Sequence, residues 1–260
     1  MHEHHRRAID KAKDRLLAEP DVLAVLVGGS IAKNIERPDS DVDLIVVTTD
    51  DGWRRRRHAN AVAFLWHDLT DNDGGYVEGR YVSRSFVLAA AERGSEPTRH
   101  SFTGTFAVHC VDPAITTALP LIPRYPDHDR QRRINAFLAQ LQLNRWFFWH
   151  EARRRNDPYL RTRAASDIVL FGVRLILAHN RILFPCQKRL METLAGATEK
   201  PADIIQLATD FLNAPTDETM EAFCRCVADF QPWGSPDLLS QFLADVELSW
   251  FESAAPIGEW

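Results

Sequence analysis

Apolar residues along the chain follow two periods, one typical of strands and one typical of helices. Short β-branched runs bounded by turn residues predict buried strands at 22–27 and 41–47. Three further segments are strand candidates: 62–66, 76–87 (as strands or as a hairpin near Gly79) and 105–111. Apolar residues at helical spacing predict an amphipathic helix over 6–19, which Pro20 ends. The first half therefore predicts a sheet with a helix packed on it.

The second half of the chain is helical in pattern. A linker is expected where three prolines fall close together: Pro120, Pro123 and Pro126. Helices are expected at 129–155 and 159–178, with one more closed by Gly196 and further starts marked by Pro201, Thr216, Ser235 and Pro236. We therefore expect two domains, a sheet domain at 1–119 and a helical domain at 120–260.

The first strand ends at a turn of small residues. Gly28 and Gly29 lack a Cβ, so a ligand can approach their backbone closely. Ser30 then opens a short helical turn at 31–35, and the unpaired N–H groups of a helix start suit phosphate. The turn is therefore a candidate phosphate site made of Gly28, Gly29 and Ser30.

Two carboxylates mark the start of the second strand. Asp41 and Asp43 are two residues apart, so both side chains leave the same face of a strand. They repel each other there, and a cation between them would remove the repulsion. Carboxylate oxygens are the ligands that Mg²⁺ prefers, together with substrate phosphates. The alternative is a turn with two solvated aspartates.

The glycine–serine turn, ten residues and then the Asp-x-Asp pair resemble the signature of the nucleotidyltransferase superfamily, which includes DNA polymerase beta and the aminoglycoside nucleotidyltransferases. The resemblance covers 22–47. It departs at Asn34, where a glycine is common, but asparagine tolerates left-handed backbone. The resemblance implies an α+β fold, with a polymerase-beta-like domain of mixed sheet followed by a C-terminal helical bundle. It also implies transfer of a nucleoside monophosphate from a nucleoside triphosphate with two Mg²⁺ ions.

The same resemblance assigns roles to particular residues. Asp41 and Asp43 would hold the metal ions, and a third carboxylate on a later strand would join them and help activate the attacking hydroxyl. Glu78 is the candidate for this third acid, with competitors at Asp68, Asp71 and Asp73. Lys188 closes an Asn-Arg-x-x-Phe-Pro-x-x-Lys pattern of helical domains in small-molecule nucleotidyltransferases, so it could neutralise triphosphate charge. A solvated surface lysine is the alternative.

The net charge and the residue composition argue against some classes of binding partner. A formal net charge of −5 argues against general nucleic-acid binding. Four consecutive arginines at 54–57 point in different directions on a helix, which favours solvated surface and leaves room for one arginine near phosphate. Four cysteines without metal spacing fit free thiols in a reducing cytoplasm, and no signal peptide or membrane span is expected.

The expected function is transfer of a nucleoside monophosphate, AMP by preference, from ATP or another nucleoside triphosphate to a hydroxyl of a small-molecule acceptor. The protein would act as a monomer or a homodimer. One alternative is a nucleotide-binding or antitoxin-like module with weak or no catalysis. Another is a nucleotidyltransferase that acts on an RNA end or a protein hydroxyl, and the acidic charge weighs against RNA.

Overall fold

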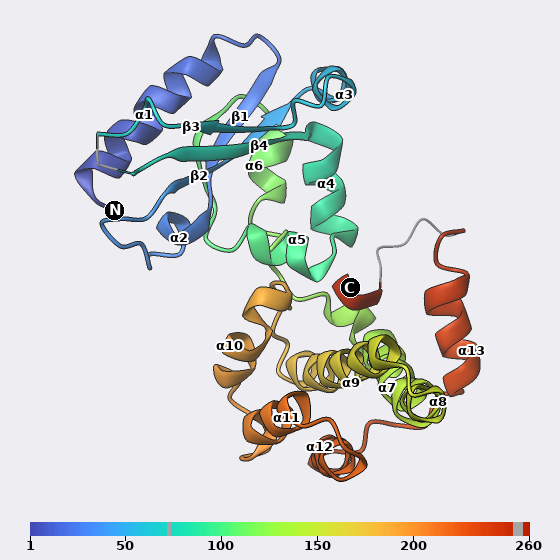
Figure 1. The fold of residues 1–260 in the computed structure, drawn as a ribbon. Helices are drawn as coiled ribbons and strands as arrows, with labels where there is room; N and C mark the ends of the chain where they lie inside the picture. Colours follow the sequence, from blue (N-terminus) through green and yellow to red (C-terminus); the bar gives the residue numbers. More distant parts are fainter. Residues whose placement is uncertain (72–73, 252–256) are drawn as a thin grey trace. The chain divides into compact units, whose positions relative to one another are not determined.

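The computed structural model describes residues 1–71, 74–251 and 257–260 (Figure 1). The chain divides into two compact units, Met1–Arg124 and Tyr125–Trp260. The division expected from the sequence, between residues 119 and 120, precedes this one by a few residues. Among the described helices, none combines the length and the apolar character that a membrane span requires.

The N-terminal unit is built on a five-stranded sheet with the order β3-β4-β2-β1-β5. The strands are β1 (Val22–Val27), β2 (Val42–Thr48), β3 (Ala63–Trp66), β4 (Val77–Ser83) and β5 (Phe106–Cys110). β1 runs antiparallel to β2 and β5, β2 runs parallel to β4, and β4 runs antiparallel to β3. The expected mixed sheet is thus confirmed.

Helices cover both faces of this sheet, as Figure 1 shows. They are α1 (Glu3–Leu17), α2 (Gly29–Ala32), α3 (Asp50–His58), α4 (Arg84–Arg93), α5 (Glu96–Ser101) and α6 (Pro113–Ala118). The apolar stripe of α1 packs on one face, where Leu16 meets Val25 and Val46 in one core. On the other face α4 and α6 pack over Ile45 and Val82. Burial on both faces explains why β1 and β2 read as continuous apolar runs.

Of the two alternatives for 76–87, a strand is confirmed at Val77–Ser83 and a hairpin near Gly79 is wrong. β4 passes straight through this residue, and a helix begins at Arg84 rather than a second strand. A Cβ on Gly79 would lie 2.2 Å from the Phe64 ring on the neighbouring strand. The glycine therefore makes room for an aromatic side chain and does not form a turn. Residues 70–75 are rich in turn-forming types and predict a turn, but this segment includes residues outside the described part of the chain.

The C-terminal unit is helical, which confirms the predicted class of this half. Its helices are α7 (Arg130–Leu143), α8 (Trp149–Arg155), α9 (Pro158–His179), α10 (Leu190–Ala195), α11 (Ile204–Asn213), α12 (Asp217–Phe230) and α13 (Leu238–Phe242). The short turns are η1 (Asp127–Asp129), η3 (Gln187–Arg189), η5 (Ile257–Glu259) and two π-helical turns, η2 (Asn144–Phe148) and η4 (Leu243–Glu247). α9 runs through the core, with Ile168, Leu175 and Ile176 fully buried.

Several helix ends of this unit follow the sequence signals, but Pro201 and Pro236 do not begin helices, because α11 begins at Ile204 and α13 at Leu238. Thr216 caps α12 through its side chain, and Asp157 with Pro158 opens α9. Ser235 is not a cap, because the side chain of Asp237 accepts the hydrogen bond from Ser240 N at the start of α13. The long helix expected at 129–155 is interrupted by the π-helical turn η2.

Candidate active site

The turn after β1 places backbone against a carboxylate. Gly28 N donates a 2.9 Å hydrogen bond to the carbonyl oxygen of Asp43. Gly29 has a φ of +61°, and a Cβ there would lie 1.6 Å from Asp43 Oδ2. Both the conformation and the space therefore require glycine at position 29. The next residue, Ser30, has a buried Oγ with no hydrogen-bond partner in the described chain.

Asn34 adopts the backbone that its glycine-like position requires. Its φ is 56°, in the left-handed region that asparagine enters more readily than most residues. The departure from the superfamily pattern therefore leaves the turn geometry intact.

Three carboxylates meet beside this turn. Asp41 lies directly before β2, Asp43 lies in β2, and Glu78 lies opposite Asp43 in the parallel register of β4. One oxygen from each carboxylate can be chosen so that all three lie within 4.8 Å of one another. We call Asp41, Asp43 and Glu78 the carboxylate cluster. The structure thus brings together the three residues that the sequence singled out for metal and catalysis, whose roles stay predictions.

The competitors for the third carboxylate are engaged elsewhere. Asp68 accepts a 2.5 Å hydrogen bond from Arg15, and Asp71 pairs with Arg7 and Lys11 at 2.9 and 2.8 Å. Asp73 lies outside the described residues. Of the described candidates, Glu78 is therefore the one that reaches the aspartate pair.

The surroundings of Asp43 raise its pKa. Burial, the largest cause, acts together with the negative charges of Asp41 and Glu78 to raise the pKa of Asp43 to about 7. The guanidinium of Arg80 opposes this shift. A hydrogen bond to Asp41 raises the pKa of the Tyr76 phenol. The cluster therefore holds more negative charge than its surroundings neutralise.

The donor set fits a divalent cation. Carboxylate oxygens are hard ligands, and three of them lie close enough to share an ion. The raised pKa of Asp43 reports burial of its charge and repulsion by Asp41 and Glu78, and the positive charge of a bound cation would offset both. The orphaned hydroxyl of Ser30 offers a hydrogen-bond donor to a phosphate held beside such an ion.

Two further polar residues lie close to the site and were missed from the sequence. Arg80 follows Glu78 by two positions on β4, so both leave the same face of the strand. Thr105 has a buried Oγ1 without a partner among the described residues, 4.0 Å from where a Cβ of Gly28 would lie. Side chains two positions apart on a strand share a face, and this alternation along β4 is the sequence signal that could have identified Arg80. Thr105 reaches the turn through the pairing of β5 with β1, which no local pattern shows.

Lys188 lies in the C-terminal unit, in the turn η3, and its side chain is exposed. Its role in neutralising triphosphate charge therefore stays a prediction.

The N-terminal unit thus combines a mixed sheet, clustered carboxylates, a Gly-Gly-Ser turn and a helix start, an arrangement whose donor groups suit a divalent cation and a phosphate. Residues 7–69 match the family model described as "Nucleotidyltransferase domain". This segment includes the turn, Asp41 and Asp43, and it confirms the superfamily resemblance seen in the sequence. The N-terminal unit thus carries a nucleotidyltransferase domain, and nucleotidyl transfer is the class of activity that this domain supports.

One similar solved structure is the crystal structure of a nucleotidyltransferase-like protein from Exiguobacterium sibiricum 255-15. The similarity covers 96% of this chain and 80% of that chain, at 12% sequence identity and a TM-score of 0.49. The search of curated proteins finds no match to this chain.

Proposed function

We propose that this protein transfers a nucleoside monophosphate, AMP by preference, from a nucleoside triphosphate to a hydroxyl of a small-molecule acceptor. The observation that carries the proposal is the carboxylate cluster beside the Gly28–Ser30 turn, with three acidic oxygens within 4.8 Å. In this reaction the acceptor oxygen forms a bond to the α-phosphorus. The bond from that phosphorus to the pyrophosphate oxygen breaks, and pyrophosphate leaves.

The roles follow from the chemistry of each group. Asp41, Asp43 and Glu78 would hold two Mg²⁺ ions, which supply positive charge for the attacking and leaving oxygens when bound. The backbone of Gly29 and the hydroxyl of Ser30 bind the terminal phosphates, and Gly28, whose N–H is engaged by Asp43, leaves room for their close approach. Glu78 accepts the proton of the acceptor hydroxyl, because it lies at the strand position facing Asp43.

The proposal assigns acceptor binding to the helical domain. A cavity of about 920 Å³ within this unit supports the assignment, since ligand sites commonly have this size. Arg163 and Asp167 line it, joined by a 2.6 Å hydrogen bond, and burial raises the pKa of Asp167. The amide of Gln140 is buried there with Nε2 unpaired in the described chain. Asn144 in the π-helical turn η2 also lines the cavity, and such turns are frequent at functional sites.

Four free thiols, at Cys110, Cys186, Cys224 and Cys226, support a reducing compartment, so we place the reaction in the cytoplasm.

The test is a double variant, D41N with D43N, assayed for Mg²⁺-dependent release of pyrophosphate from each of the four nucleoside triphosphates with a library of hydroxyl-bearing small molecules. The wild-type chain should release pyrophosphate, fastest with ATP, and the double variant should not. The matched control is D68N, because Asp68 is an exposed acid paired with Arg15 outside the site. Unaltered release by the double variant would exclude the assignment. Nucleotide binding by calorimetry without any release by the wild-type chain would instead favour a binding module.

A further inference from the structure

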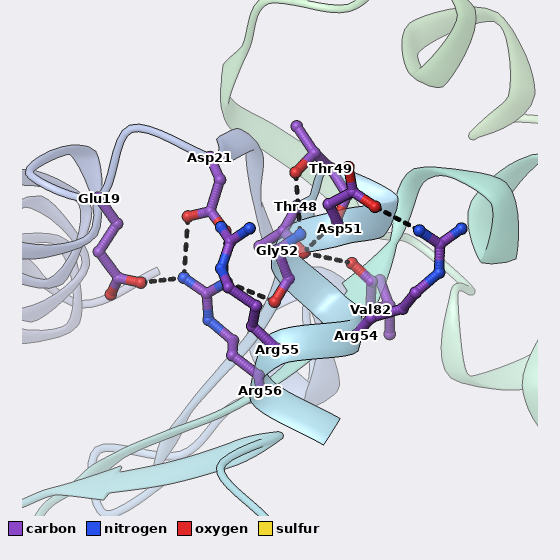
Figure 2. Close-up of polar contacts among 10 residues, drawn as sticks. All are labelled: Glu19, Asp21, Thr48, Thr49, Asp51, Gly52, Arg54, Arg55, Arg56 and Val82. Atoms are coloured by element: carbon purple, nitrogen blue, oxygen red, sulfur yellow. Dashed lines mark hydrogen bonds and ion pairs between the residues drawn. The ribbon is translucent and has the colours of Figure 1, made fainter. Parts of the chain in front are cut away.

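Three of the four consecutive arginines of α3 are held by acidic residues of the same unit. Figure 2 shows Arg54 paired with Asp51 of its own helix, and Arg55 reaching Asp21 at 3.1 Å. Arg56 binds the same Asp21 carboxylate at 2.6 Å. These guanidinium groups therefore have their charge compensated within the protein.

Arg56 is the most firmly held of the three. It also pairs with Glu19, and its guanidinium lies 4.4 Å from the centre of the Tyr81 ring. Arg56 therefore connects α3 with the sheet, through Tyr81, and with the loop before β1, through Glu19 and Asp21, and is not available to a ligand.

Arg57 differs from its neighbours. Within the described residues its side chain makes no ion pair and no hydrogen bond, and it lines a cavity of about 500 Å³ in the N-terminal unit. Arg80 lines the same cavity and likewise has no ion pair among the described residues. Its Nη2 donates a 2.8 Å hydrogen bond to Ser101 Oγ, which holds it in place. We call this space the arginine cavity.

The other walls of the arginine cavity are suited to a flat apolar group. Trp53 from α3 and Phe86 from α4 both line it, and Phe86 is 39% exposed although it is a large aromatic side chain. Val62 and Pro97 complete the apolar surface, and Thr98 adds a hydroxyl beside Ser101. Two guanidinium groups that form no ion pair among the described residues, and two aromatic side chains, thus line one space.

We propose that the arginine cavity binds a small ring-bearing molecule that carries a phosphate group, with Arg57 and Arg80 holding the phosphate and Trp53 and Phe86 packing against the ring. Two guanidinium groups match the charge of a phosphate monoester, and their planar N–H groups suit its oxygens. Aromatic side chains stack on flat rings and contribute affinity beyond the area they bury.

This site goes beyond the proposed nucleotidyl transfer and stands apart from the carboxylate cluster. Arg80 is two strand positions from Glu78, which along a strand is about 7 Å. A ligand held in the arginine cavity therefore lies near the reacting groups without occupying them. Binding there does not require the carboxylates, so the two proposals can fail separately.

The experiment is calorimetric titration of the full-length chain with phenyl phosphate in EDTA, which keeps divalent ions off the carboxylate cluster. The wild-type chain should bind phenyl phosphate, and R57Q should bind it about tenfold more weakly through loss of one charge-assisted contact. R54Q is the matched control, since Arg54 lies on the same helix, is exposed and faces Asp51 instead of the cavity. It should bind as the wild type does.

Further titrations test the contributions of the ring and of the phosphate separately. They also test whether binding in the arginine cavity is independent of the carboxylate cluster. Inorganic phosphate and phenol should each bind at least about tenfold more weakly than phenyl phosphate, because each lacks one half of the recognition. The double variant D41N with D43N should retain binding. No detectable binding by the wild type would overturn the proposal, as would equal weakening by R57Q and R54Q. Equal affinity for inorganic phosphate, or loss of binding in the double variant, would overturn it too. Circular dichroism of each variant establishes that it is folded.

Discussion

The titration of Asp43 makes the N-terminal unit more stable in weak acid than in weak base when no divalent ion is bound. The ordinary pKa of an aspartate is 3.8, and burial with the charges of Asp41 and Glu78 raises that of Asp43 to about 7. The folded chain therefore keeps a proton that the unfolded chain loses. As pH rises from about 4 to about 7, the free energy of unfolding falls. Above pH 7 Asp43 is ionised in both states, and the free energy of unfolding stays lower by the full amount.

The size of this effect follows from the shift in pKa. A difference of about three units corresponds to about 4 kcal/mol at most. Because Asp43 is only partly buried, solvent screening reduces this figure, and about 2 kcal/mol is the smaller value that we expect. D43N removes the charge and keeps the shape, so in EDTA it should stabilise the unit by about 2–4 kcal/mol near pH 8 and by much less near pH 4.

Hydrogen exchange of the amides of β1 and β2 measures this stability in the N-terminal unit alone. Taking the difference between D43N and wild type at each pH cancels the contribution of titrating groups that do not interact with Asp43. D68N is the control, because Arg15 lowers the pKa of Asp68 and its loss should not stabilise the unit at any pH. The reasoning is refuted if D43N is no more stable than the wild type at pH 8, or if the difference does not change with pH. Mg²⁺ should stabilise the wild type at pH 8 more than it stabilises D43N.

Two substitutions test the scaffold of the site by urea unfolding. G29A should cost about 2–4 kcal/mol and abolish pyrophosphate release, since its Cβ meets the Asp43 carboxylate at a positive φ. G196A, at a helix end with a negative φ and no atom closer than 3.6 Å, should be nearly neutral, and an equal effect of both would contradict the steric argument. R56A should cost about 2–3 kcal/mol because it leaves two partly buried carboxylates without their partner, whereas R54A should change stability by less than about 0.5 kcal/mol. Similar losses for both arginines would show that burial does not set their contribution.

The motif between residues 22 and 47 could be predicted because its signals are local. A β-branched run, two glycines and an Asp-x-Asp pair each fix the backbone within a few residues, and the structure places β1 and β2 accordingly, whereas α2 begins at Gly29, before the helical turn expected at 31–35. Glu78 was found through the family resemblance, since its neighbour Asp43 is reached only by parallel pairing of strands far apart in the chain.

The misses arise from contacts between distant segments. Gly79 reads as a turn residue until the Phe64 ring is placed against it. The arginines of α3 read as solvated surface, but Arg56 pairs with Asp21, which lies before β1. In each case the deciding partner lies on another element, and local propensity carries no information about it.

The close contact between Gly29 and Asp43 changes how the glycine–serine turn should be understood. Backbone freedom for phosphate would be served by glycine at either position, but a Cβ on Gly28 would meet no atom closer than 3.9 Å. At Gly29 it would collide with the carboxylate itself. The second glycine is thus required by the carboxylate cluster even without nucleotide, so the phosphate turn and the acidic cluster form one steric unit. Because Gly28 N also hydrogen-bonds to the carbonyl oxygen of Asp43, we expect a shift of Asp43 to displace the turn as well.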